Sequence, residues 1–516
     1  MFRRVLRNQR GYSLIFAVPM AALLLASTLA YLKWQVSAQY NARHQVASIQ
    51  AYYTAQAAVI AVPLAYMRNQ PPGFSTTTSI PFADGYIDGV GRYLRPLIQY
   101  TSFQGMQAGN LIQNKDYLLS ATGIATVNDA RGFRTKNVEV RRKALLRIRK
   151  KSFQQYFYFT DIEQTRFGEF IWFFGGDTLY APVHSNTDIG VHSGAVFYGF
   201  VTTVGRILTP NGSSFYALPA PGYRERVRRI DIPVRADLLR EAASAGGTWL
   251  DTRNNEETYG LRFRGSAADV WIWRTGTTSP FMVEPPENTI TIPSNREYGI
   301  FCDGDLWIQG SVTGNVGIGA QGNLRLMDNI VYTDCATWPY LVLPNSPNSM
   351  TLVSEAPEPV ARTDPWTGIL IANTWANGRE DAANHFGVGT GSQHRRDIAI
   401  HGQLFALNSS FTFQEHNDNE GYDPYVYSCP QHGQDERGYI YLRGAVTQHR
   451  RGYVHRGNTE TTGIRSGYLK SYRWDPRWDT RSGNVYAAPP FQVDLTSQGF
   501  QKWEILGWED VAKSNE

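Results

Sequence analysis

Acidic residues recur in pairs in the middle of this chain, where two carboxylates could work as an acid and a base. Asp303 and Asp305 flank Gly304, and Asp177 and Asp188 lie in an earlier segment. Paired carboxylates hydrolyse glycosidic bonds, and parallel β-helices often bind or cleave polysaccharides. An Asp-Gly-Asp sequence is also typical of a turn. We therefore predict that these acids are structural and that the protein is not an enzyme; a membrane-anchored β-helical polysaccharide hydrolase or lyase is the alternative.

Two histidines near Asp188 have the composition of a metal site without its spacing. His184 and His192 lie on either side of this acid, but no helical or cysteine-rich context fixes their separation. Histidines in strands and turns are more often hydrogen-bond partners than ligands. We therefore predict no metal site here. The sequence also contains no convincing glycine-rich phosphate loop, Ser/His/Asp pattern or nucleotide fingerprint.

The loop 417–423 is rich in oxygen-bearing side chains. Its acids Asp418, Glu420 and Asp423 resemble part of a calcium loop, but the regular alternation that ends in a bidentate Glu is missing. A solvated loop is the simpler interpretation. These three acids are a weak calcium candidate, and no other cofactor is predicted.

The element that organises the chain is its N-terminal apolar segment. The 21 residues from Tyr12 to Leu32 carry no charge, and as a helix they would span roughly 30 Å, enough to cross a bilayer. Four arginines precede them and the first acid is Asp84. The positive-inside rule therefore predicts a single pass with the N-terminus in the cytoplasm and the chain after Lys33 outside.

Three interpretations of this segment remain open: a plain signal anchor, a secretory signal cut near Val36-Ser37-Ala38, and a prepilin leader. The apolar run is longer than the usual core of a cleaved signal. The basic leader ending in Gly11, followed by Tyr12-Ser13-Leu14-Ile15, resembles the leader of type IV prepilins and pseudopilins. The resemblance implies cutting by a prepilin peptidase between Gly11 and Tyr12.

The helix is expected to continue beyond the membrane. Residues 35–62 contain no Gly or Pro, and alanines recur at three- and four-residue spacing, so we predict one helix over 12–62 that ends at Pro63. Residues 51–58 resemble a segment of PilX-type minor pilins, with Gln56 where these usually carry Glu. The resemblance implies packing among other pilin helices in a hetero-oligomeric filament, with Phe16 and Pro19 at the packing face.

Position 16 departs from the pilin pattern. Pilins usually carry Glu at the fifth mature position, where its carboxylate is thought to pair with the amine of a neighbouring subunit. Here that position is Phe16. The departure favours a priming or tip subunit over a bulk subunit, and it also fits a protein that never enters a filament.

The remaining sequence predicts a large β-rich extracytoplasmic protein. Its 516 residues include 47 Gly and 26 Pro, with 13% aromatic and 18% charged residues. The formal charge of +5 gives no reason to expect a nucleic-acid partner. The predicted parts are a leader (1–11), the helix (12–62), a linker (63–84), a small membrane-proximal β unit (85–151), a large β-rich, solenoid-like domain (152–500) and a C-terminal tail (501–516).

The small unit is expected to contain strands over 117–127 and 133–148. The second strand and its flanks carry ten basic residues between Arg131 and Lys151 and one acid, Glu139. Anionic lipid or DNA would suit such a face. Because no aromatic residues are interleaved for stacking, we predict a solvated strand face.

The large domain is predicted to be a β-solenoid from its texture of short apolar alternations separated by turns, without a strict period. The segment Pro182-Val183-His184-Ser185-Asn186, the rung 444–448 and the ending 467–490 resemble an uncharacterised domain family found behind pilin-like N-termini. This resemblance covers about residues 150–495 and implies architecture without an established activity.

Two expectations concern single residue types. Of three cysteines, Cys302 and Cys335 are expected to pair in an oxidising compartment and leave Cys429 free. Exposed tryptophans are candidates for adhesive contacts, although most tryptophans are core residues. The candidates are Trp271, Trp273, Trp474 and Trp478.

Together these observations predict a non-enzymatic, inner-membrane-anchored minor pilin or pseudopilin of a type IV pilus or type II secretion-like filament. Its place would be in assembly initiation or at the tip, with the bulk periplasmic or, once assembled, extracellular. A plain envelope structural protein is a further alternative.

Overall fold

The computed structural model divides the chain into two compact units. Unit 1 comprises residues 1–101, 115–150 and 503–516, and unit 2 comprises 102–114 and 151–502. Unit 2 is therefore inserted in the sequence between two segments of unit 1. The structure describes residues 5–69, 79–100, 106–107, 110–111, 116–129, 136–150, 153–165, 168, 170–174, 177–192, 194–210, 222–279, 281–337, 340–360, 365–372, 397–414, 435–457, 465–478 and 503–511.

Unit 1 begins with one long helical segment. Helix α1 spans Val5–Val59, a π-helical turn covers Ile60–Leu64, and α2 spans Ala65–Asn69. The prediction that Pro63 ends the helix is wrong. Proline has no N–H to donate, but the wider π turn accommodates it, and Pro63 and Leu64 are buried.

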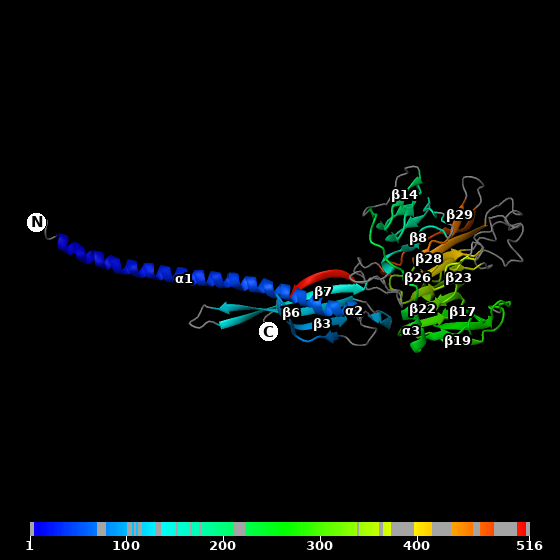
Figure 1. Cartoon of the computed structure of the whole chain (residues 1–516), viewed down its shortest axis with the longest axis horizontal. Helices are drawn as coiled ribbons and strands as arrows, with labels where there is room; N and C mark the ends of the chain where they lie inside the picture. The colour runs from blue at the N-terminus through cyan, green and yellow to red at the C-terminus, as the bar shows by residue number, and fades with distance from the viewer. Residues whose placement is uncertain are drawn as a thin grey trace. The chain divides into compact units, whose positions relative to one another are not determined.

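A fully antiparallel sheet forms the rest of unit 1, in the order β1-β3-β6-β7-β31, with β2 paired to β3. Helix α1 runs along this sheet (Figure 1) and contacts β3, β6 and β7. The predicted strands over 117–127 and 133–148 are confirmed as β6 and β7. The strands are β1 (Ser79–Pro81), β2 (Gly85–Ile87), β3 (Gly91–Tyr100), β6 (Asp116–Asp129), β7 (Lys136–Lys150) and β31 (Trp503–Val511).

Strands β1 and β31 correct two predicted boundaries. Residues 79–81, assigned to a linker, pair with β3. The prediction of a separate tail over 501–516 is wrong, because Trp503–Val511 pairs with β7. A partner about 350 positions earlier in the sequence leaves no local trace near the C-terminus.

The regular secondary structure described in unit 2 consists mainly of strands, and it includes one α-helix, α3 (Asp237–Gly246). Its first strands are β4 (Met106–Gln107), β5 (Asn110–Leu111), β8 (Tyr158–Ile162), β9 (Thr178–Leu179), β10 (Val183–Ser185), β11 (Ile189–Gly190), β12 (Val196–Phe197), β13 (Val201–Thr203), β14 (Ile207–Leu208) and β15 (Tyr223–Arg224). The later strands are β16 (Thr248–Leu250), β17 (Glu257–Gly265), β18 (Ala267–Arg274), β19 (Asn288–Thr291), β20 (Glu297–Cys302), β21 (Leu306–Val312), β22 (Asn315–Ala320), β23 (Leu324–Tyr332), β24 (Ser349–Ser354), β25 (Gly368–Ile371), β26 (Ile398–Ala406), β27 (Ser410–Phe413), β28 (Asp435–Arg450), β29 (His455–Gly457) and β30 (Arg465–Lys470).

Most of these strands pair in parallel with a strand of the next coil of chain. In two blocks the partners lie 18 residues apart: β9, β10 and β11 pair with β12, β13 and β14, and β20 pairs with β22. Strand β21 begins its pairing with β23 at the same offset and shifts register between Ile308 and Gly310. The offset therefore recurs without becoming a strict period, in agreement with the prediction from sequence. Elsewhere the offset changes, for example to 34 residues between Asn315 and Ser349, and a regular solenoid stays a prediction.

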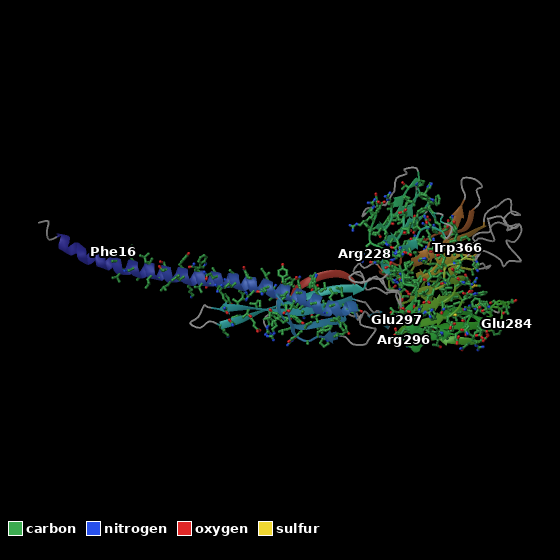
Figure 2. The ribbon with its side chains drawn as sticks, viewed as in Figure 1. Phe16, Arg228, Glu284, Arg296, Glu297 and Trp366 are labelled. Atoms are coloured by element: carbon green, nitrogen blue, oxygen red, sulfur yellow. The ribbon has the colours of Figure 1, made fainter. Side chains whose placement is uncertain are left out.

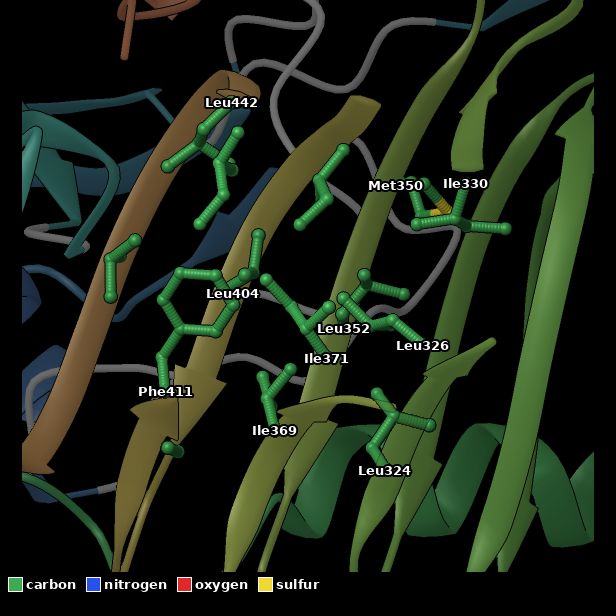
Figure 3. Close-up of a cluster of buried hydrophobic side chains, with 14 of the residues drawn as sticks. Leu324, Leu326, Ile330, Met350, Leu352, Ile369, Ile371, Leu404, Phe411 and Leu442 are labelled. Carbon is green, nitrogen blue, oxygen red and sulfur yellow. The ribbon is translucent and has the colours of Figure 1, made fainter. Parts of the chain in front are cut away.

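Stacked apolar side chains fill the interior of unit 2. Leu324, Ile369 and Phe411 occupy equivalent places in successive strands and are at most 2% exposed. Figure 3 shows these side chains together with Leu326 and Ile371 of the neighbouring row. The predicted fold class, mainly β with one long N-terminal helix, is confirmed.

Candidate functional site

The first half of helix α1 exposes a long run of large apolar side chains. Phe16, which Figure 2 labels on this helix, is 68% exposed, and Leu23 is 72% exposed. The helix from Phe16 onward is long and apolar enough to cross a membrane, and none of its most apolar window is buried against the rest of the chain. This half of α1 therefore fits a single-pass membrane anchor.

The predicted processing and packing residues all lie in this helix. Gly11 and Tyr12 fall within α1. Phe16 contributes to the exposed apolar surface, and Pro19 is inside the helix. The structure thus places these residues on one continuous element, while cleavage and filament packing stay predictions.

The second half of α1 is fixed to the sheet through small side chains. Ala51, Ala55 and Ala58 are fully buried against it. Opposite them is Gly123 of β6, where an added Cβ would meet the backbone oxygen of Ala51 and lie 2.6 Å from the backbone nitrogen of Ala55. Only glycine allows the helix to come this close to the strand.

A buried hydroxyl strengthens the same contact. Thr54 is fully buried, and its hydroxyl donates to the backbone oxygen of Gln50 at 2.8 Å and lies 3.2 Å from that of Val90. Gly91, with φ +145°, leaves room for this side chain. The helix is therefore held to unit 1 by a close, well-defined packing face.

The His-Ser-Asn segment singled out in the sequence is the centre of a buried polar network in unit 2. The ring of His184 lies 2.7 Å from the Thr202 hydroxyl and 3.1 Å from the Asn186 side-chain oxygen. Asn186 donates to Asp161 at 2.7 Å. Asp161 also accepts from Arg229 at 2.5 Å and lies 3.1 Å from the His449 ring.

This network joins five separate segments of chain, which contribute Asp161, His184 with Asn186, Thr202, Arg229 and His449. Burial opposes ionisation of Asp161, but hydrogen bonds from His449 and Asn186 and the charge of Arg229 hold the pKa of its carboxyl below the ordinary value. The Asp161 carboxylate is therefore satisfied by structural partners. Sequence analysis missed Asp161 and His449, because neither belongs to a local motif.

His184 gives this network a pH dependence. Burial lowers the pKa of His184 to about 4 from 6.5, although Asn186 and the charge of Asp161 act in the opposite direction. The unfolded chain takes up this proton near pH 6.5 and the folded chain does not. The contribution of uncharged His184 to the free energy of unfolding is therefore fully present above pH 6.5. It falls by up to about 1.4 kcal/mol for each pH unit below that value and stops falling below the pKa of the folded state.

We expect His184→Gln to lose less stability than the wild type between pH 7.5 and pH 5, as measured by thermal unfolding. His401 provides a reference within the same unit, because burial lowers its pKa to about 3. The pH dependence that His401 contributes should therefore persist in His184→Gln. An unchanged pH dependence in His184→Gln would contradict the assignment.

The acids proposed as catalytic candidates bind the backbone of neighbouring coils. Asp303 accepts from the backbone N–H of Thr252 at 2.7 Å, and Asp305 accepts from that of Asn323 at 2.7 Å. The turn interpretation of this pair is thus consistent with its contacts.

The other acid pair is similarly engaged. Asp188 accepts from the backbone N–H of Arg206 at 2.7 Å. Asp177 forms an ion pair with Lys470 at 2.8 Å. All four acids therefore have structural partners.

The cation candidates have different outcomes. The ring of His192 stacks on Phe174 at 4.9 Å, and no cluster of three or more His, Cys, Asp or Glu side chains among the described residues is arranged to hold a metal. The weak calcium candidates Asp418, Glu420 and Asp423 lie outside the described residues.

The prediction of adhesive tryptophans is wrong for three of the four residues. Trp271, Trp273 and Trp478 are 4%, 8% and 1% exposed. Trp474 is partly buried and packs against the main core of unit 2. Trp271 and Trp273 lie on β18, which pairs antiparallel with β17 and β19, and both rings pack with Phe281, a contact that residue type alone could not indicate.

The predicted pairing of Cys302 with Cys335 is also wrong. Both thiols are free and buried. The Cys302 sulfur lies 3.6 Å from the backbone oxygen of Asp305, and the Cys335 sulfur lies 3.5 Å from the carboxylate of its neighbour Asp334. Cys429 lies outside the described residues.

The basic strand β7 is partly neutralised within unit 1. Arg142 and Arg147 form ion pairs with Asp510 and Glu509 of β31, and Arg141 pairs with Glu139. The acids of β31 thus complement the arginines of the strand beside it. Sequence analysis considered the basic residues without these partners.

A family model matches one part of the chain. Residues 116–205 match a family described as Domain of unknown function (DUF4900), a range that covers β6 to β13 and includes Asp161, His184 and Asn186. The match spans less than half of the chain. No curated protein matches it.

One similar solved structure is the competence-associated pilin ComZ from Thermus thermophilus. The two chains are 10% identical, and the match covers 90% of this chain and 98% of that one with a TM-score of 0.29. A TM-score this low does not establish a common fold.

Proposed function

We propose that this protein is a non-enzymatic, membrane-anchored subunit of a pilin-like filament, a minor pilin or pseudopilin. The observation that carries the proposal is the division of α1. Its first half offers an exposed apolar surface from Phe16 to Leu32, and its second half is bound to an antiparallel sheet through Ala51, Ala55 and Gly123. Such a helix can be anchored in lipid and then pack against the helices of other subunits.

Phe16 favours a priming or tip position for this subunit. A mid-helix carboxylate would need a partner amine inside the apolar assembly, whereas Phe16 needs none. A subunit at the tip has neighbouring subunits on one side only, so it needs fewer packing interfaces than a subunit in the shaft. Prepilin peptidase and other pilins are the partners that the proposal requires.

The N-terminal residue of the mature protein tests this proposal. We expect Tyr12 when the protein is isolated from cells with prepilin peptidase and Met1 when it is isolated from cells without the peptidase. Met1 in both would contradict the pilin proposal and leave a plain anchored envelope protein. A start at Gln39 would indicate a cleaved secretory signal.

The matched control is Gly11→Leu, which keeps the apolar segment and changes only the residue before the predicted cut. We expect this variant to keep Met1 in cells with the peptidase and to remain in the membrane fraction. Normal processing of Gly11→Leu would contradict cleavage at this bond.

A further inference from the structure

Four arginines form an exposed patch on two successive coils of unit 2. We call Arg206, Arg224, Arg226 and Arg228 the arginine patch; all four are exposed, and Arg228 lies at the surface of unit 2 in Figure 2. Among the described residues, none of the four forms an ion pair. The sequence between them, residues 211–221, contains no acidic residue.

Backbone pairing brings these residues together. Strand β15 pairs with β13, so that Arg224 is in register with Thr202. The backbone N–H of Arg226 donates to the oxygen of Gly205 at 3.3 Å, which places Arg226 beside Arg206 of the preceding coil. The patch is therefore continuous across the two coils.

Two acids of the patch are engaged with the backbone. Asp188 accepts from the N–H of Arg206, and Glu225 accepts from the N–H of Ile207 at 2.8 Å. Their two charges leave the four arginines with an excess of positive charge. Arg229 offers a contrast, because it pairs with Asp161 at 2.5 Å and Asp231 at 3.0 Å.

An alternative role for charged residues on the last strand of a stack is to prevent that strand from pairing with the edge of another sheet. Lysine is the usual residue in that role, whereas all four cationic residues here are arginines, whose planar guanidinium groups offer paired donors.

We propose that the arginine patch binds an acidic polysaccharide through its carboxylates. Guanidinium groups bind carboxylates with two parallel hydrogen bonds, and four of them on adjacent coils can hold successive charges of one polymer.

The surroundings of the patch favour a polysaccharide over single-stranded nucleic acid. Sequence-independent binding of nucleic-acid strands relies on several aromatic rings for base stacking, and the described residues around the patch, 204–208 and 222–229, include one aromatic residue. This inference goes beyond the proposed function and holds whether or not the chain enters a filament.

Direct binding by the full chain in detergent tests the proposal, with polygalacturonate as the probe and neutral dextran as the negative control. We expect wild-type protein to bind polygalacturonate but not dextran. The variant Arg224→Gln/Arg226→Gln/Arg228→Gln should bind at least about tenfold more weakly, since charge-assisted hydrogen bonds are lost. The single change Arg206→Glu should weaken binding in the same direction and guards against misfolding of the triple variant.

The matched control removes three exposed arginines elsewhere in unit 2, with acids nearby in the sequence: Arg253→Gln/Arg262→Gln/Arg274→Gln. We expect its affinity to stay within about twofold of the wild type. No binding by the wild type, or equal loss in both triple variants, would overturn the proposal. Tighter binding of a 20-base-pair DNA duplex than of polygalacturonate would overturn it in favour of nucleic acid. Self-association of the patch variant with unchanged polysaccharide binding would reduce the arginines to edge protection.

Discussion

Replacing Arg451 with methionine is expected to lower the free energy of unfolding of unit 2 by about 3–5 kcal/mol. Arg451 is buried and donates to the Glu163 carboxylate at 2.7 Å and to the backbone oxygen of Ile171 at 2.6 Å. Glu163 is fully buried. Without Arg451 its charge would lose its only ion-pair partner among the described residues, and burying an unpaired charge is costly.

The packing around this pair makes the loss larger. The guanidinium carbon of Arg451 lies 3.8 Å from the centre of the Phe173 ring, so part of its desolvation is compensated by cation–π attraction. Thr160 donates a further hydrogen bond to the other Glu163 oxygen. Methionine fills much of the space but supplies none of these donors.

Chemical denaturation of the full chain, followed through the transition of unit 2, measures the effect. Arg253→Met is the control, because Arg253 is 73% exposed and pairs with Glu257 at the surface, where an ion pair contributes at most about 1 kcal/mol. The double variant Glu163→Gln/Arg451→Met should recover part of the stability, since the unpaired charge is removed. A double variant less stable than Arg451→Met would refute the explanation.

Gly123→Ala is expected to destabilise unit 1 by about 3 kcal/mol and to loosen α1 from the sheet. The new methyl group would collide with the backbone of α1 at Ala51 and Ala55. These are backbone atoms of a helix and cannot rotate away like the end of a flexible side chain. The helix must therefore move out, and the buried alanine stripe loses its contacts.

Thermal unfolding and limited proteolysis between α1 and β6 measure this change. Gly507→Ala in β31 is the matched control, because an added Cβ there meets nothing within 4 Å. We expect the control to unfold like the wild type. Equal behaviour of the two variants would show that the close approach at Gly123 does not hold the helix. In a filament, loosening of α1 would also displace the sheet of unit 1 from the part of α1 that forms the membrane anchor.

The sequence by itself determined the elements with short-range causes. The absence of charge between Tyr12 and Leu32 and the absence of Gly and Pro over 35–62 were sufficient for one long helix. The alternation of residue types was sufficient for β6 and β7. A structural role for Asp303 and Asp305 was also predicted from the Asp-Gly-Asp sequence, but the backbone groups that they bind, those of Thr252 and Asn323, belong to other coils.

Only the tertiary structure decided which distant segments meet. It placed the C-terminal strand β31 beside β7, the rings of Trp271 and Trp273 inside unit 2, and Asp161 against both Asn186 and His449. It also decided that Pro63 is absorbed by a π turn. The physical reason is common to all of these. Local propensity depends on a few neighbouring residues, whereas strand register and burial depend on partners tens to hundreds of positions away, which no window of sequence contains.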